Sequence, residues 1–341
     1  MNRPSFAHLL SLTSVIALTF GVSACSGDDA PSDGLGSETG DGDPSGDGDG
    51  DPTGDGDGDP SGDGDGDPTG DGDGDTQPIE VTLQFAAAVG DQAVACGESY
   101  AGLGSEGTTV EVQDFRFYVH AIELVDVDGV GTPLTLAQDG VWQLDDLALL
   151  DFEDGTGACQ DAGTAELNDV VVGTAPAGDY TGLRFVLGVP FEHNHHAVDT
   201  APSPLNVPSM FWNWQGGYKF ARIDLLNGHP DSPAWFWHQG STGCESGGPT
   251  EPPTEECMRP NLLPVEFEAF DASADVIVLD LATLVAGVDV SQNTEATAPG
   301  CMSGVTDPEC VALFPNLGLD LDTGACASDC ADQQVFRLGS K

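Results

Sequence analysis

The chain has 341 residues, and its 58 Asp and Glu against 8 Lys and Arg give a formal net charge of −50. This balance excludes nucleic acid as a natural partner, because phosphate backbones are bound by basic surfaces. The stretch from Ser26 to Pro78 carries −18 of that charge and the rest of the chain −32, an excess that attracts cations.

The N-terminus has the order of an export signal. Arg3 supplies a positive start, Leu9 to Val22 form an apolar stretch too short to span a bilayer, and small residues lead to Cys25. The cysteine matches a bacterial lipobox, so residues 1–24 are predicted to be a lipoprotein signal peptide and Cys25 the lipidated N-terminus. An ordinary secretory signal with an incidental cysteine is the alternative. We expect an exported protein with a lipid anchor in the envelope membrane; Ser26 favours the outer membrane, on its periplasmic or outer face.

Residues 25–78 are predicted to be a disordered linker. Four copies of the unit Asp-Pro-Ser/Thr-Gly-Asp-Gly-Asp-Gly fill positions 43–74. The unit has no apolar side chain to bury, so burial cannot offset the entropy lost on ordering. Its D-x-D-x-D spacing also resembles the start of a calcium-binding loop, but the bidentate Glu and the flanking helices of that motif are missing.

The cysteines predict disulfides. Setting Cys25 aside leaves an even number, which in an oxidising compartment is typical of a disulfide framework whose connectivity the spacing alone leaves open. The chain has no C-x-x-C-H and no C-x-x-C, which excludes c-type haem attachment and argues against a zinc ribbon. The cysteines concerned are Cys96, Cys159, Cys244, Cys257, Cys301, Cys310, Cys326 and Cys330.

Residues 79–341 are predicted to form an all-β, antiparallel β-sandwich-like single domain. Apolar and polar residues alternate from Ile79 to Phe85, as in a half-buried strand. Further short apolar runs are separated by Gly, Pro, Asp or Asn, a pattern typical of sandwiches. The expected strands are residues 79–85, 115–124, 182–189, 218–226, 235–238, 263–270 and 276–281; only residues 142–150 have helical spacing.

Several histidines are candidate ligands. In an extended segment His193 and His195 would face one side and His196 the other, and a solvated polar loop is the alternative. His120 lies in an expected strand, where a satisfied core histidine is the simpler interpretation. His238 precedes a Gly-rich turn that is expected to place its imidazole at the mouth of a site. The chain lacks the G-x-S-x-G and H-E-x-x-H motifs of hydrolases, and imidazole clusters suit copper at least as well as zinc.

The segment from Met210 to Phe220 is unusually aromatic. Trp212 and Trp214, two positions apart on a strand, would stack on one face. Composition alone favours packing in the core of a sandwich, and a carbohydrate-stacking platform is the alternative.

The order of several sequence blocks resembles the MbnP-like family, also described as four-Cys proteins of a metallo-mystery pair. The resemblance covers most of residues 79–340, and its W-x-W-Q-x-G-Y-K-F and H-x-G-S-T-G-C blocks are specific. It implies a periplasmic or surface copper protein, with the metal expected as Cu(I). The blocks are Cys96-Gly97, Gly188-Val189-Pro190-Phe191, Asn194-His195, Ala201–Leu205, Met210–Phe220, His238–Cys244 and Gly300–Gly304.

The resemblance also implies how the copper site forms. The family's partner is a dihaem cytochrome c of the peroxidase or MauG type, which oxidises the first Trp of W-x-W, here Trp212, to kynurenine, and copper binding depends on that change. An indole N–H is only a donor, whereas kynurenine offers an aniline nitrogen and a ketone oxygen. Since Trp235 and Trp237 lie beside His238, it stays open whether Trp212 is the only oxidisable ring.

The remaining ligands implied are imidazoles. His195 and His238 are expected, His120 is a third candidate, and Met302 is a lower-ranked soft donor. The extra histidines His193 and His196 leave the choice within 193–196 open. The resemblance further implies the disulfides Cys96–Cys159 and Cys244–Cys257, with Cys301–Cys310 and Cys326–Cys330 as local closures.

We therefore expect a monomer that binds or sequesters copper at the cell envelope, without catalytic turnover. A copper-dependent redox enzyme or electron-transfer protein is the first alternative. A surface module whose tryptophans stack on glycans is the second.

Overall fold

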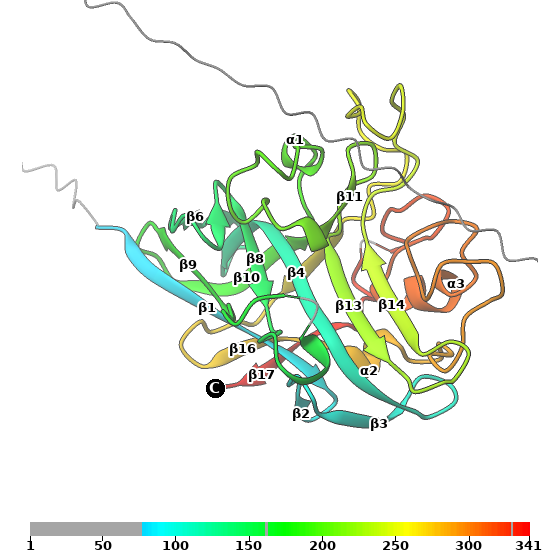
Figure 1. The fold of residues 1–341 in the computed structure, drawn as a ribbon. Helices are drawn as coiled ribbons and strands as arrows, with labels where there is room; N and C mark the ends of the chain where they lie inside the picture. Colours follow the sequence, from blue (N-terminus) through cyan, green and yellow to red (C-terminus); the bar gives the residue numbers. More distant parts are fainter. Residues whose placement is uncertain (1–76, 161–162, 329) are drawn as a thin grey trace, which may run out of the picture. The chain divides into compact units, whose positions relative to one another are not determined.

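The computed structural model describes residues 77–160, 163–328 and 330–341. The predicted signal peptide, the lipidation site Cys25 and the acidic linker lie outside the described residues. The described chain is mostly β-structure in two large sheets, which confirms the predicted all-β class (Figure 1). Among the helices of these residues, none is long and apolar enough to cross a membrane.

The first sheet has six strands in the order β17-β16-β1-β9-β6, with β2 paired to β1. The pair β1 and β16 is parallel, a departure from the predicted antiparallel pattern. The strands are β1 (Ile79–Val89), β2 (Gln92–Ala93), β6 (Thr135–Leu136), β9 (Val170–Ala175), β16 (Asp275–Asp280) and β17 (Phe336–Ser340).

The second sheet has nine strands, with the main order β14-β13-β4-β10-β15. The long β4 pairs with five of them, β3, β5, β8, β10 and β13. Its pairings are antiparallel. The strands are β3 (Ser99–Leu103), β4 (Thr108–Asp126), β5 (Gly131–Pro133), β7 (Gln143–Leu144), β8 (Leu147–Asp151), β10 (Tyr180–Leu187), β13 (Ala221–Leu226), β14 (Ala234–Gln239) and β15 (Leu263–Phe267).

The remaining elements are short. A hairpin of β11 (Phe211–Asn213) and β12 (Gly217–Tyr218) stands apart from both sheets. The helices are α1 (Phe191–Asn194), α2 (Leu281–Leu284) and α3 (Cys310–Leu313), with 3-10 turns η1 (Gly157–Cys159), η2 (Pro208–Met210) and η3 (Phe314–Leu317).

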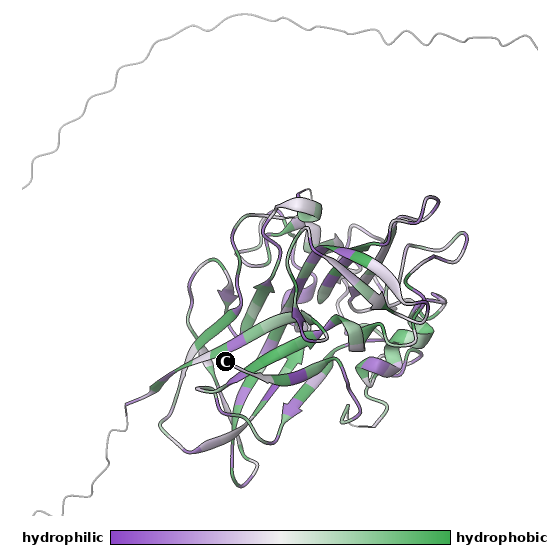
Figure 2. Ribbon diagram, turned by 90° about the horizontal axis from the view of Figure 1, so that it is seen from below, coloured by the Kyte–Doolittle hydropathy of each residue, from purple (hydrophilic) through white to green (hydrophobic). Residues whose placement is uncertain are grey.

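Aromatic rings join the two large sheets face to face. Phe85 of β1 packs edge-on against Phe117 of β4 and Phe185 of β10, with ring centroids 6.2 and 5.8 Å apart. Phe336 of β17 contacts the same two rings at 5.8 and 5.2 Å. Figure 2 shows hydrophobic residues along the strands of both sheets, with hydrophilic ones between them. This packing is that of a sandwich.

Residues 142–150 form the hairpin β7–β8 and not a helix. Leu147 to Asp151 are all buried, and Leu150 pairs with Phe117 of β4. The turn is made at Asp145, whose φ of 53° lies in the left-handed region that Asp tolerates. Pairing with β4 and β7 and the burial of every residue of β8 therefore override the helical spacing of the sequence.

The four disulfides have the implied pairing. Cys96–Cys159 ties the segment after β2 to η1 across 63 residues, and Cys244–Cys257 closes the loop that follows β14. Cys301–Cys310 and Cys326–Cys330 are local closures.

Candidate metal centre

Trp212 lies on β11, at the rim of the second sheet, with its six-membered ring over Gly240. A Cβ placed on Gly240 would lie 2.5 Å from Cζ3 and 2.8 Å from Cη2 of Trp212, so only glycine leaves room for the ring. Trp214 lies in the turn after β11 and is 39% exposed. The expectation that both rings stack on one face is therefore wrong, because the strand ends at Asn213, whose side chain accepts the Gly216 N–H at 2.7 Å.

The half-buried Trp212 lines an open cleft of about 410 Å³, so it is not part of the core. Met302 and Cys244 line the same cleft, whereas none of the three candidate imidazoles, His120, His195 and His238, lines it. The other lining residues are Asn213, Gln215, Gly216, Ser241, Thr242, Gly243 and Ala298.

His195 lies beside the β11–β12 hairpin. Its Nδ1 is 3.2 Å from the Trp214 carbonyl oxygen, and since a carbonyl only accepts, Nδ1 carries the proton and Nε2 the lone pair. Burial lowers the pKa of His195, and the Trp214 contact opposes this only in part. The imidazole is therefore held in the neutral form, with the nitrogen that faces Cys257 able to bind a metal.

Asn194 connects the three segments around His195. It is buried, and its amide nitrogen donates to Ser241 Oγ at 2.8 Å and lies 3.2 Å from His195 Nε2. Its amide oxygen accepts the Tyr218 N–H at 2.9 Å. A Cβ on Gly217 would lie 2.5 Å from the Asn194 carbonyl oxygen, so the hairpin backbone approaches this residue closely.

His193 and His196 face each other and not His195. The expected extended segment is wrong, because residues Phe191–Asn194 form the turn α1. The rings of His193 and His196 have centroids 5.5 Å apart, and His193 Nε2 lies 3.3 Å from Asp145. The helical turn thus separates His195 from its two neighbours.

His120 lies on β4, 7% exposed, with Nδ1 3.0 Å from the Gly188 carbonyl oxygen. Burial lowers its pKa, while that hydrogen bond and the nearby Asp146 and Glu192 raise it. Its Nε2 therefore holds a lone pair, but the structure does not bring this imidazole into the cleft of Trp212.

His238 is buried on β14 and not at the mouth of the cleft, because Asp224 on β13 holds it. Its Nε2 lies 2.7 Å from Asp224 Oδ1, and its ring stacks on Phe236 with centroids 5.4 Å apart. Burial lowers the pKa of His238 although Asp224 opposes this shift. The arrangement leaves Nδ1 as the nitrogen that could bind a metal, with a carboxylate fixing the other side of the ring.

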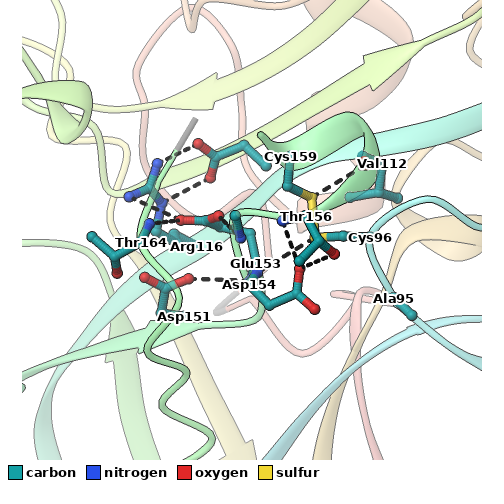
Figure 3. Close-up of a disulfide and its surroundings, with 12 residues drawn as sticks. Ala95, Cys96, Val112, Arg116, Asp151, Glu153, Asp154, Thr156, Cys159 and Thr164 are labelled. Carbon is teal, nitrogen blue, oxygen red and sulfur yellow. Dashed lines mark hydrogen bonds and ion pairs between the residues drawn. A yellow bond between two sulfur atoms is a disulfide. The ribbon is translucent and has the colours of Figure 1, made fainter. Parts of the chain in front are cut away.

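Asp224 belongs to a chain of ion pairs that ends at Glu153. The N–H of the next residue, Asp154, donates to Cys96 Sγ of the Cys96–Cys159 disulfide at 3.4 Å. Arg222 binds Asp224 at 2.6 Å and Asp114 at 3.1 Å. Asp114 in turn binds Arg116, whose Nη1 lies 3.6 Å from Glu153 (Figure 3). The chain thus links His238 to the segment after β8.

The ionisation of Asp151 next to this chain makes stability depend on pH. Burial raises its pKa to about 7, against the opposing effect of Arg116. A raised pKa means that the folded state keeps a proton that the unfolded chain has lost, so this contribution is full below pH 4 and is lost as pH rises to 7.

Replacing Asp151 by Asn removes this titration and keeps an oxygen that can accept the Glu153 N–H. From pH 5 to pH 7.5 the free energy of unfolding of Asp151→Asn is expected to rise by about 2.5 kcal/mol relative to the parent. Urea denaturation at the two pH values measures this. An unchanged difference between the two proteins would contradict the assignment.

Substitution of Gly240 tests its contact with Trp212. We expect Gly240→Ala to destabilise the protein by about 1–3 kcal/mol and to move the indole, because the added methyl overlaps the ring. Thermal unfolding and tryptophan fluorescence measure the two effects. Gly248→Ala, with no atom within 4 Å of its Cβ position, is the matched control and should change neither.

Sequence reasoning did not single out three functional supports of the site. Ser303 has φ of 60° and donates to the His238 carbonyl at 3.0 Å while accepting the Gly240 N–H at 3.2 Å. Asn194 contacts the imidazole of His195, and Asp224 contacts the imidazole of His238. The signal for Asp224 was available, because Arg222 and Asp224 interrupt an otherwise apolar strand.

Comparisons with known proteins agree with this architecture. A family model described as MbnP matches residues 78–303. Among solved structures, MbnP from Methylosinus trichosporium is 36% identical, with a TM-score of 0.68, and the match covers 77% of this chain and 99% of that one. Among curated proteins nothing matches.

Proposed function

This chain belongs to the MbnP family, and from that relationship we propose that it is a copper-binding protein of the cell envelope whose site forms when Trp212 is oxidised to kynurenine. We further propose that a dihaem cytochrome c of the peroxidase or MauG type carries out the oxidation. The role is copper sequestration or homeostasis, without turnover, in a protein that is exported and anchored through Cys25.

The observation that carries the proposal is the position of Trp212. Trp235 and Trp237 are fully buried on β14 of the second sheet, whereas Trp212 on the β11–β12 hairpin is half-buried in a cleft that opens to solvent. An electron-transfer partner can approach such a ring closely. The accessibility therefore supports Trp212 as the modified residue and disfavours Trp235 and Trp237.

The donor set of the unmodified chain explains why oxidation is needed. The indole nitrogen has no lone pair outside the ring, and the sulfurs of Cys244 and Cys257 are joined in a disulfide. Loss of one carbon and gain of one oxygen would open the indole to an aniline nitrogen and a ketone oxygen. Those atoms would face the cleft that Met302 also lines, and a thioether is a soft donor suited to Cu(I).

His195 fits the role of the imidazole ligand in this proposal. It is neutral, its proton lies on Nδ1, and it contacts the Trp214 carbonyl in the hairpin that also carries Trp212. His120 and His238 stay candidates, each with one nitrogen fixed by Gly188 or Asp224 and the other free of that contact. The copper, when bound, would be held in a low coordination number.

Expression with and without the dihaem partner tests the proposal. We expect purified protein to keep copper only after expression with an active partner, because only then does the cleft contain kynurenine donors. Metal analysis after gel filtration measures the copper content. Equal copper content without the partner would contradict the dependence on oxidation.

A further inference from the structure

A group of three potential ligand atoms lies beside the cleft but is blocked by a covalent bond. His195 Nε2 is 3.6 Å from Cys257 Sγ, and these two atoms and Cys244 Sγ lie within 4.8 Å of one another. In residues 77–160, 163–328 and 330–341 this is the one such group of His, Cys, Asp or Glu. The two sulfurs are bonded to each other, so they offer no thiolates.

The distances fit a metal site apart from that bond. With metal–sulfur bonds of about 2.3 Å and metal–nitrogen bonds of about 2.0–2.1 Å, trigonal or tetrahedral angles place nitrogen and sulfur about 3.5–3.8 Å apart. The observed 3.6 Å between His195 and Cys257 lies in this range. Only the two sulfurs would have to separate, by about 1.8 Å.

We propose that the Cys244–Cys257 disulfide masks a thiol-dependent metal site. A dithiol reduces the disulfide, giving it two electrons and two protons and becoming a disulfide itself. The Cys244 and Cys257 thiolates and His195 Nε2 then bind one Cu(I), and the two thiol protons are released. Two thiolates and an imidazole are the ligands that a soft monovalent cation prefers. This site shares His195 with the proposed function but does not depend on the oxidation of Trp212.

The surroundings allow both steps. Cys244 is partly exposed in the cleft, so a small dithiol can reach its sulfur. The loop between the two cysteines contains no helix or strand and is mostly exposed, so the sulfurs can move apart without disrupting either sheet. Four glutamates in this loop, Glu245, Glu251, Glu255 and Glu256, attract a cation.

One existing contact must give way. The Asn194 amide nitrogen lies 3.2 Å from His195 Nε2 and would be displaced from it by the metal. Its hydrogen bond to Ser241 Oγ at 2.8 Å uses the other amide hydrogen and can remain. His195 keeps its orientation through the contact of Nδ1 with the Trp214 carbonyl.

The experiment is thiol alkylation of the full folded domain with its linker, followed by peptide mass spectrometry. The protein is treated with dithiothreitol, freed of it, and alkylated with or without one equivalent of Cu(I). We expect Cu(I) to lower the alkylation rate of Cys244 and Cys257 at least about tenfold. Even the loss of a group that only contacts a metal ligand changes metal affinity by about 10- to 100-fold, so binding through the ligands themselves should have at least this effect. Cys326 and Cys330, a local pair outside the ligand group, serve as the internal control. Their alkylation rate should fall less than tenfold when Cu(I) is added.

Two variants make the outcome decisive. His195→Gln keeps an amide near the Trp214 carbonyl but removes the imidazole, and it should weaken the protection, because only the two thiolates remain as ligands. Trp212→Phe removes the residue on which the proposed function depends, and it should leave the protection intact. No protection in the reduced parent would overturn the inference, and so would equal protection in His195→Gln and the parent. If Trp212→Phe loses copper only while the Cys244–Cys257 disulfide is intact, that result concerns the proposed function alone.

Discussion

Replacing Trp212 by Phe is expected to abolish copper retention by the protein with intact disulfides, even after expression with the dihaem partner. Phenylalanine keeps an aromatic ring at this position but has no nitrogen that oxidation can convert to an aniline, so no new donor faces the cleft. The fold should survive, because Trp212 is half-buried and outside the core. Metal analysis of the purified variant should show at least about a tenfold lower copper content.

The matched control is Trp214→Phe. Trp214 is 39% exposed in the turn, and only its backbone carbonyl contacts His195, so this variant should retain copper. Equal copper contents in Trp212→Phe and the parent would show that the donors lie elsewhere. Equal losses in both variants would point to damage of the hairpin and not to a specific role of Trp212.

Replacing His195 by Ala has the second large effect expected. The substitution removes the neutral imidazole nitrogen and releases the Asn194 amide from its contact at 3.2 Å. Copper affinity should fall by more than the 10- to 100-fold that loss of an outer-shell partner costs. Competition against a chromogenic Cu(I) chelator measures the affinity of the kynurenine-containing protein.

His196→Ala is the control for this prediction, because His196 is exposed and faces His193. We expect its copper affinity to match that of the parent. If His196→Ala weakens binding and His195→Ala does not, the ligand within residues 193–196 has been assigned to the wrong imidazole.

The sheet positions could be predicted because their pattern is local. Alternation from Ile79 to Phe85 and the apolar run of residues 115–124 both lie in the observed strands β1 and β4. The hairpin at 142–150 could not, since its fully buried β8 has no alternation and depends on contact with β4. The parallel pairing of β1 with β16 is likewise a long-range choice that neither segment encodes alone.

The sequence named the candidate site residues, whereas their geometry depends on contacts between segments far apart in the chain. Ordered sequence blocks placed Trp212 and His195 in one site, and both lie at the β11–β12 hairpin. The burial of His238 against Asp224 was not foreseen, because the partner lies on another strand. The short turn α1, which directs His193 away from His195, ends at Asn194, where the Gly217 backbone of the distant hairpin packs closely.

Peptide mass spectrometry across residues 205–222 tests the central claim most directly. The protein is expressed with and without the dihaem cytochrome, and the copper content of each sample is measured. Loss of one carbon and gain of one oxygen is predicted at Trp212 only when the partner is present, with copper retained only in that form. A copper-loaded protein with unmodified Trp212 would contradict the account.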